Sequence, residues 1–101
     1  MSLIPHRYHW DDTSTRELFK AMVSLKTPHE TRQFFRDLCT PEEIDEMVRR
    51  WQVAKHLAKG ESYREIADKV DVSTSTVTRV AHWLHSGMGG YQLILQRLGL
   101  L

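Results

Sequence analysis

The segment SYREIADKVDVSTSTVTRVAHWLH, residues 62–85, carries the strongest structural pattern in the chain. Counted from Tyr63, the fifth residue is the small Ala67, and the fourth, eighth, tenth, fifteenth and eighteenth residues are all apolar. Those apolar residues are Ile66, Val70, Val72, Val77 and Val80. Two helices that cross at about 90–120° need a small residue where they touch and apolar residues in the angle between them. The segment therefore predicts a helix-turn-helix.

The turn and the second helix of this motif have residue types that suit their positions. Asp71 stands in the turn, where a positive φ is common and Asp is tolerated better than most residues. Ser73 is the predicted N-cap of the second helix. The outward side chains of that helix are Thr74, Ser75, Thr76, Thr78 and Arg79. Short hydroxyls and free backbone N–H groups suit phosphates and base edges in a major groove, so double-stranded DNA is the predicted partner.

Outward from the motif, capping signals predict the other helices. A Ser or Thr followed three residues later by Glu is a capping box, which marks a helix start. These pairs are Ser14 with Glu17, Thr27 with Glu30, Thr40 with Glu43 and Ser62 with Glu65. The helix after Thr40 is predicted to be the longest, at about 41–59, with Gly60 as its left-handed C-terminal cap. A last helix is expected from Tyr91 to Gly99.

These signals predict an all-α fold with six helices. No segment shows a strand pattern. We expect an N-terminal arm at residues 1–12 and a single helical domain at 13–101, with the helix-turn-helix at 62–85. A chain of 101 residues buries only about two-thirds of its unfolded surface, so a second copy would help to complete its core.

Composition excludes several classes of protein. The single cysteine, Cys39, cannot form an intramolecular disulfide, which favours a cytoplasmic location. No apolar run approaches the roughly 20 residues that span a bilayer, so we expect no contact with a membrane. We expect no enzyme activity, because no nucleophile–base pair or phosphate-binding glycine loop is present. His82 and His85 lack a third metal ligand, so we expect neither a metal nor a cofactor.

The charge of the motif leaves an alternative open. The net charge of the chain is only +1. Between residues 59 and 85, apart from histidine, the charged residues are Lys59, Arg64, Lys69 and Arg79 against Glu61, Glu65, Asp68 and Asp71, so the segment is formally neutral. The alternative hypothesis is a dimeric protein–protein adaptor whose helix-turn-helix has lost DNA binding.

Four short runs resemble the Trp repressor family, especially its Trp-repressor-like YerC/YecD proteins. They are CTPEE at 39–43, KGE at 59–61, YREI at 63–66 and TVTR at 76–79. The likeness covers residues 14–98. It implies a six-helix, intertwined homodimer with a helix-turn-helix on each subunit, which acts as a transcriptional regulator and represses genes.

The resemblance also assigns site residues. The positions that contact DNA in the family correspond to Arg64, Ser73, Thr74, Ser75 and Thr78; we add Arg79, whose charge should strengthen binding. The positions that hold tryptophan in the tryptophan-sensing member correspond to Thr40, Arg50 and Arg79. Two departures follow: Val80 stands where that member has glycine, and Trp83 where it has serine. We therefore expect no control by tryptophan and hypothesise that Trp83 fills the effector pocket; no other small-molecule effector is indicated.

Overall fold

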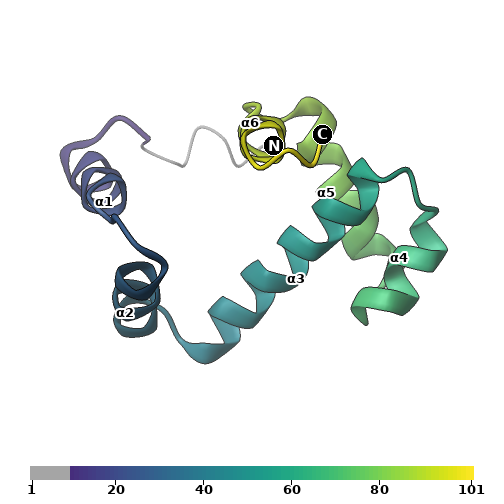
Figure 1. Ribbon diagram of the computed structural model, residues 1–101, viewed down its shortest axis with the longest axis horizontal. Helices are drawn as coiled ribbons and strands as arrows, with labels where there is room; N and C mark the ends of the chain where they lie inside the picture. The colour runs from purple at the N-terminus through teal and green to yellow at the C-terminus, as the bar shows by residue number, and fades with distance from the viewer. Residues whose placement is uncertain (1–9) are drawn as a thin grey trace. The chain divides into compact units, whose positions relative to one another are not determined.

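The computed structural model describes residues 10–101, and within that range the chain forms six α-helices and no strand (Figure 1). The helices are α1 (Thr13–Val23), α2 (Pro28–Leu38), α3 (Pro41–Ala58), α4 (Tyr63–Val70), α5 (Thr74–Ser86) and α6 (Gly90–Arg97). The all-α, six-helix prediction is confirmed. Most of the predicted N-terminal arm lies outside the described residues. No helix between residues 10 and 101 is long and apolar enough to cross a membrane.

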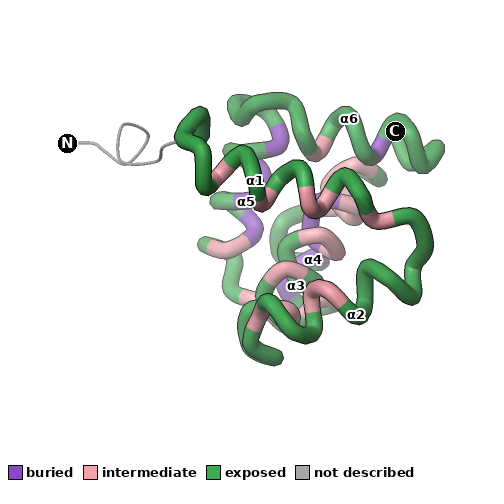
Figure 2. The backbone as a smooth tube through the Cα atoms, turned by 90° about the vertical axis from the view of Figure 1, so that its left-hand side faces the viewer, coloured by how far each residue is buried: buried purple, intermediate pink, exposed green. Residues whose placement is uncertain are grey.

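The described residues divide into two compact units, with the boundary between Cys39 and Thr40. The first unit contains α1 and α2. Neither helix has a buried residue, as Figure 2 shows by the lack of purple along both. Apolar side chains therefore remain accessible on this unit in a single copy of the chain: Val23 is 84% exposed and Leu38 is 47% exposed.

Helix α1 begins earlier than the sequence predicted. Its N-cap is Asp12, whose Oδ1 accepts a hydrogen bond of 2.7 Å from the backbone N–H of Thr15. The prediction that Ser14 caps this helix is wrong, because Ser14 already lies inside it. Asp caps as well as Ser does. A start at Asp12 therefore adds helical residues without the loss of a cap.

Helix α2 has the predicted N-cap but only half of the predicted capping box. The Thr27 hydroxyl accepts a hydrogen bond of 3.1 Å from the backbone N–H of Glu30. The Glu30 carboxylate reaches one residue further back and accepts from the backbone N–H of Lys26, at 2.9 Å. Pro28 occupies the first helical turn, where its missing N–H leaves no bond unmade.

The second unit contains the buried core. Helix α5 packs against α3, α4 and α6, and α3 also contacts α4 and α6. The central cluster takes two residues from each of three helices: Val53 and Ala54 of α3, Ile66 and Ala67 of α4, and Val77 and Val80 of α5. Leu95 of α6 is fully buried as well. The core of this unit is thus the joint between the long helix and the helix-turn-helix.

Local signals set the ends of α3 as predicted. The Thr40 hydroxyl accepts from the Glu43 backbone N–H at 3.1 Å, and the Glu43 carboxylate accepts from the Thr40 backbone N–H at 2.8 Å. At the other end, Gly60 has a φ of +82°, and its N–H donates to the carbonyl oxygen of Leu57 at 3.0 Å. A positive φ here favours glycine, since a side chain would strain the backbone.

Candidate nucleic-acid interface

The helix-turn-helix consists of α4, a tight turn and α5. Asp71 adopts the left-handed conformation, with φ 62° and ψ 55°, as the sequence predicted. The backbone N–H of Val72 donates to the carbonyl oxygen of Ala67 at 3.1 Å, so the turn closes over the first helix. The side chains at the predicted contact positions are buried or partly buried, and Ala67 is 8% exposed. The two helices therefore meet at a buried, apolar contact.

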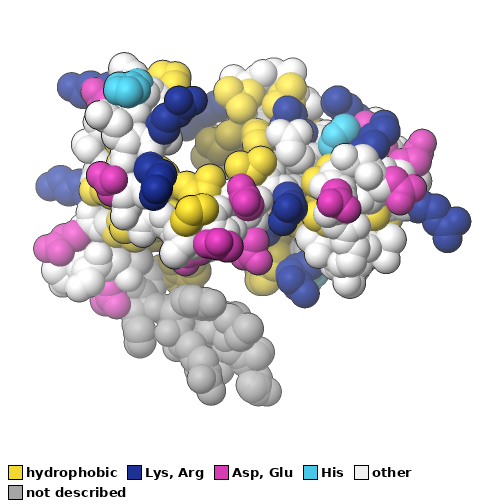
Figure 3. Space-filling view, turned by 90° about the horizontal axis from the view of Figure 1, so that it is seen from below, with side chains coloured by type: hydrophobic (Ala, Val, Ile, Leu, Met, Phe, Trp, Pro, Cys, Tyr) yellow, Lys and Arg dark blue, Asp and Glu magenta, His cyan; other side chains and the backbone are white. Residues whose placement is uncertain are grey.

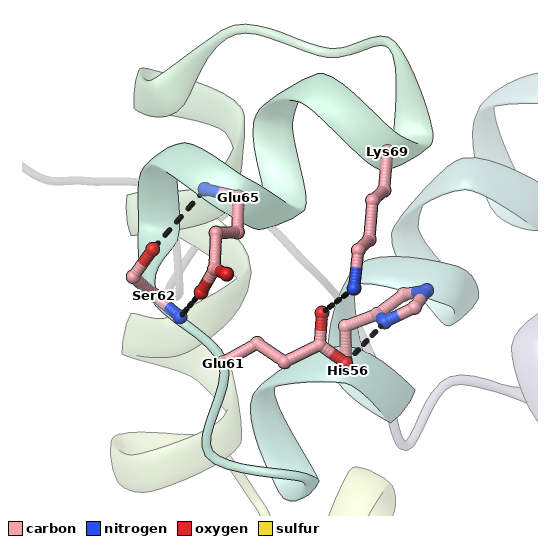
Figure 4. A network of polar contacts seen from close by, with 5 residues as sticks. All are labelled: His56, Glu61, Ser62, Glu65 and Lys69. Carbon is pink, nitrogen blue, oxygen red and sulfur yellow. Dashed lines mark hydrogen bonds and ion pairs between the residues drawn. The ribbon is translucent and has the colours of Figure 1, made fainter.

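Helix α4 begins at a complete capping box. The Ser62 hydroxyl accepts from the Glu65 backbone N–H at 3.2 Å, and the Glu65 carboxylate accepts from the Ser62 backbone N–H at 3.1 Å (Figure 4). The hydrogen bond from the Ser62 backbone N–H, and then the interaction with the Ser62 hydroxyl, hold the pKa of the Glu65 carboxyl below its ordinary value. Arg64 lies exposed in the first turn beside this box. It forms no ion pair with any residue that the structure describes.

The start of α5 exposes a row of hydroxyl groups. Four of the predicted DNA-contacting residues here, Ser73, Thr74, Ser75 and Thr78, are exposed. The Ser73 hydroxyl caps the helix by accepting from the backbone N–H of Thr76 at 3.1 Å, and its oxygen lies 2.9 Å from the hydroxyl of Ser75. The Thr78 hydroxyl donates to the carbonyl oxygen of Thr74 at 3.0 Å. The exposed face at the start of α5 is therefore polar, and hydrogen bonds within the helix hold several of its hydroxyl groups.

Backbone donors at the same end of α5 remain available. The N–H groups of Thr74 and Ser75 have no acceptor within residues 10–101. The first turn of α5 also contains no acidic side chain that would compete for them. Arg79, one turn further along, is exposed and forms no ion pair with the described residues. Free N–H donors and an unpaired cation together suit a phosphate.

A pocket of about 250 Å³ lies behind the recognition face, between α3 and the turn of the motif. Three of the predicted effector residues line it: Arg50, Arg79 and Val80. Sequence reasoning missed its other lining residues, which are Glu46, Arg49, Asp71, Val72 and Thr76. The spacing of Glu46 and Arg50 by four residues was a usable signal. Their charged atoms lie 4.0 Å apart with both side chains well exposed, so the pair contributes little stability.

The other two predicted effector residues do not join this pocket. The Thr40 hydroxyl is engaged in the cap of α3, and Thr40 is not among the residues that line the pocket. Trp83 is 52% exposed and lines a different, open hollow of about 610 Å³. Trp83 is therefore not among the residues that line the pocket with Arg50 and Arg79. Trp83 lies one turn beyond Arg79, where α5 faces α6.

The second hollow is mainly apolar. Its lining residues are Trp51, Trp83, Gly87, Met88, Gly90, Tyr91, Ile94 and Leu98. The rings of Trp51 and Tyr91 stack with their centroids 6.4 Å apart, and burial raises the pKa of the Tyr91 hydroxyl. Met88 is 93% exposed. Hydrophobic side chains, drawn in yellow, also reach the surface in the space-filling view (Figure 3).

The arrangement of α4 and α5 on a long helix agrees with comparisons with known proteins. A sequence model of the Trp repressor protein family matches residues 13–99. The chain is 38% identical to the uncharacterized protein YerC of Bacillus subtilis over 82 residues, which are 81% of this chain and 79% of YerC. The chain therefore belongs to the Trp repressor family and resembles its YerC-like members, as the sequence motifs indicated.

Solved structures show the same fold. The crystal structure of a TrpR-like protein from Eubacterium eligens is 39% identical and superposes with a TM-score of 0.87, covering 91% of this chain and 95% of that one. A second crystal structure, from Staphylococcus aureus, is 38% identical with a TM-score of 0.84 and covers 89% of this chain and 90% of that one. The six helices thus form a Trp-repressor-like fold. Family membership favours a DNA-binding regulator over an enzyme.

Proposed function

We propose that this chain is a sequence-specific DNA-binding transcriptional regulator, a repressor, which acts as a homodimer through α4 and α5. One observation supports this most strongly. The first turns of α5 expose hydroxyls, two backbone N–H groups without an acceptor among residues 10–101, and Arg79, which forms no ion pair within the same range. Buried residues beneath them pack α5 against α4. A surface that must read DNA needs both features, since an exposed polar helix gains precision only from a rigid base.

Each proposed contact residue has a chemical role. Ser73, Thr74, Ser75 and Thr78 approach phosphates and base edges in the major groove, and bridging waters extend the reach of their short side chains. Arg64 and Arg79 neutralise phosphates on either side of the groove, because neither is used in an ion pair within residues 10–101. The contacts of the hydroxyl row carry the sequence preference, and those of the arginines carry affinity.

The exposed apolar surface supports the homodimer. Two helices, α1 and α2, have no buried residue, and the hollow beside Trp83 is open and apolar. Exposed apolar surface on each unit is typical of an interface between chains. A twofold dimer would place its two copies of α5 in successive major grooves, about 34–36 Å apart, on a pseudo-palindromic site.

We further propose that tryptophan does not control this regulator. Val80 is only 2% exposed and forms part of the pocket wall that contains Arg50 and Arg79. The resemblance places a glycine at this position in the tryptophan-sensing member, and the branched side chain of Val80 takes up space that the ligand would need. The helix-turn-helix of α4 and α5 then has its DNA-binding arrangement without a corepressor.

Selection of bound fragments from sheared genomic DNA tests the proposed function. The wild-type chain should enrich a pseudo-palindromic site equally with and without tryptophan. A variant with Thr74, Ser75 and Thr78 all changed to Ala should lose the enrichment while its helical circular dichroism is retained. Enrichment only with tryptophan would contradict the effector proposal. No enrichment in either arm would contradict DNA binding and favour the adaptor.

A further inference from the structure

Glu61 lies in the turn between α3 and α4, and its carboxylate bonds to both helices (Figure 4). Its Oε2 lies 2.9 Å from Nδ1 of His56, in the last turn of α3. Its Oε1 accepts a hydrogen bond of 2.8 Å from Nζ of Lys69, in the last turn of α4. Because an ionised carboxylate can only accept, Nδ1 of His56 is the donor. One side chain therefore connects three parts of the chain.

The Glu61 bridge restrains the tilt of α4 against α3, which the neighbouring hydrogen bonds do not restrain. Among residues 10–101, the side chains of Ser62 and Glu65 form hydrogen bonds only with each other's residue, so these bonds fix where α4 begins but not how it is tilted against α3. Lys69 lies near the far end of α4, which has eight residues and is about 12 Å long. A bond at that distance from the turn resists tilting of α4. Any tilt of α4 would also move α5, which packs on it.

The local environment favours these bonds. The side chains of His56 and Glu61 are only 20% and 19% exposed, so water competes with them weakly. The hydrogen bonds from His56 and then Lys69 lower the pKa of the Glu61 carboxyl from 4.5 to about 2, so the carboxylate is ionised at neutral pH. The same bond from Lys69 raises the pKa of its ammonium group. Lys69 is thus committed to Glu61, unlike Arg64 and Arg79.

We propose that Glu61 is a positioning residue for the helix-turn-helix. It fixes the orientation of α4 against α3 and thereby the orientation in which α5 meets DNA. This role rests on the proposed function, because positioning has a consequence only if α5 reads a site. Glu61 itself contacts no DNA. Its effect is transmitted through His56 and Lys69.

The loss of a negative charge and the loss of positioning predict opposite effects of Glu61→Gln on DNA binding, so one experiment can distinguish them. Removal of an acid strengthens general attraction to phosphates. Loss of positioning instead weakens binding to the selected site, by roughly three- to tenfold. We therefore expect Glu61→Gln to bind the selected site more weakly and random-sequence DNA as well as or better than the wild type. The control is Asp68→Asn, which also removes one negative charge. Asp68 lies in α4 and forms no ion pair among residues 10–101.

The Lys69→Met variant distinguishes two roles of Lys69, a bond to Glu61 and a contact with a DNA phosphate. If Lys69 acts through Glu61, Lys69→Met weakens binding to the selected site without a change in salt dependence, and the double variant is no weaker than either single variant. If Lys69 contacts phosphate instead, the salt slope falls and the effects of the two substitutions add. That result, or equal behaviour of Glu61→Gln and Asp68→Asn, would overturn the proposal.

A measurement without DNA distinguishes failure of the bridge from failure of the proposed function. Amide hydrogen exchange in α4 should be faster in Glu61→Gln than in Asp68→Asn, while exchange in α6 is unchanged. The Glu61 carboxyl carbon should titrate near pH 2 in the wild type and at higher pH in Lys69→Met. If both results hold but no DNA site is found, the proposed function fails and the bridge stands. If exchange in α4 is the same in both variants, the positioning role is wrong.

Discussion

The carbonyl oxygen of Ala67 accepts a hydrogen bond from the backbone N–H of Val72, so the residue on which α5 packs also anchors the turn that leads to α5. Ala67 is 8% exposed within the core cluster. Ala67→Leu should therefore destabilise the protein by about 1–3 kcal/mol, because the added atoms push α5 away. Urea unfolding measures this. Asp68→Leu, at the exposed neighbouring position, should change stability by no more than about 0.5 kcal/mol; equal effects of the two substitutions would show that α5 does not pack here.

The left-handed conformation of Asp71 predicts an unusual order of stability. With φ at +62°, the position suits glycine better than any residue with a branched side chain. Asp71→Gly should leave stability unchanged or raise it by up to about 1 kcal/mol. Asp71→Val should lower stability by about 1–2 kcal/mol. Thermal unfolding of the two variants checks this, and a Val variant as stable as the Gly variant would exclude the left-handed turn.

The Glu61 bridge predicts a specific acid sensitivity. A carboxyl whose pKa is lowered on folding stabilises the native state at pH values above its unfolded pKa, and this contribution is lost as the pH falls through the folded pKa. For Glu61 the window runs from about pH 4.5 down to about pH 2. The difference in stability between wild type and Glu61→Gln should be constant above pH 5 and shrink through this window. A difference that does not depend on pH would mean that Glu61 is not bridged.

Two arginines, Arg64 and Arg79, form no ion pair with the part of the chain that the structure describes, and they predict a change in salt dependence. For duplex DNA, the slope of log affinity against log salt becomes shallower by about 0.9 for each phosphate that the protein no longer neutralises. Arg64→Ala and Arg79→Ala should each reduce the slope by about that amount and weaken binding at low salt. Arg97→Ala, in the last turn of α6, should alter neither quantity. Unchanged slopes in both motif variants would place the DNA elsewhere.

Much of the fold could be predicted from the sequence because its signals are local. The caps at Thr40 and Ser62 and the turn at Asp71 each depend on residues within a few positions, and all are confirmed. The failure at α1 has the same origin. Asp12 and Ser14 are both good caps, and only the competition between them decides where the helix begins.

The candidate site was only partly predictable, because it depends on contacts between helices. The expectation that Arg79 and Trp83 share a pocket came from the resemblance to the Trp repressor family. Because α3 and α6 pack on different turns of α5, the two residues line separate hollows. The Glu61 bridge spans five and eight residues across a turn, and no periodicity in the sequence indicates it.

A footprint on the selected DNA site tests the central claim most directly. Hydroxyl-radical cleavage of that site should show two protected segments on one face of the duplex, centred about 10 base pairs apart, that disappear together when Thr74, Ser75 and Thr78 are changed to Ala. That pattern would require two copies of α5 in successive major grooves. A single protected segment, or protection that survives the substitutions, would contradict a homodimer that reads DNA through α5.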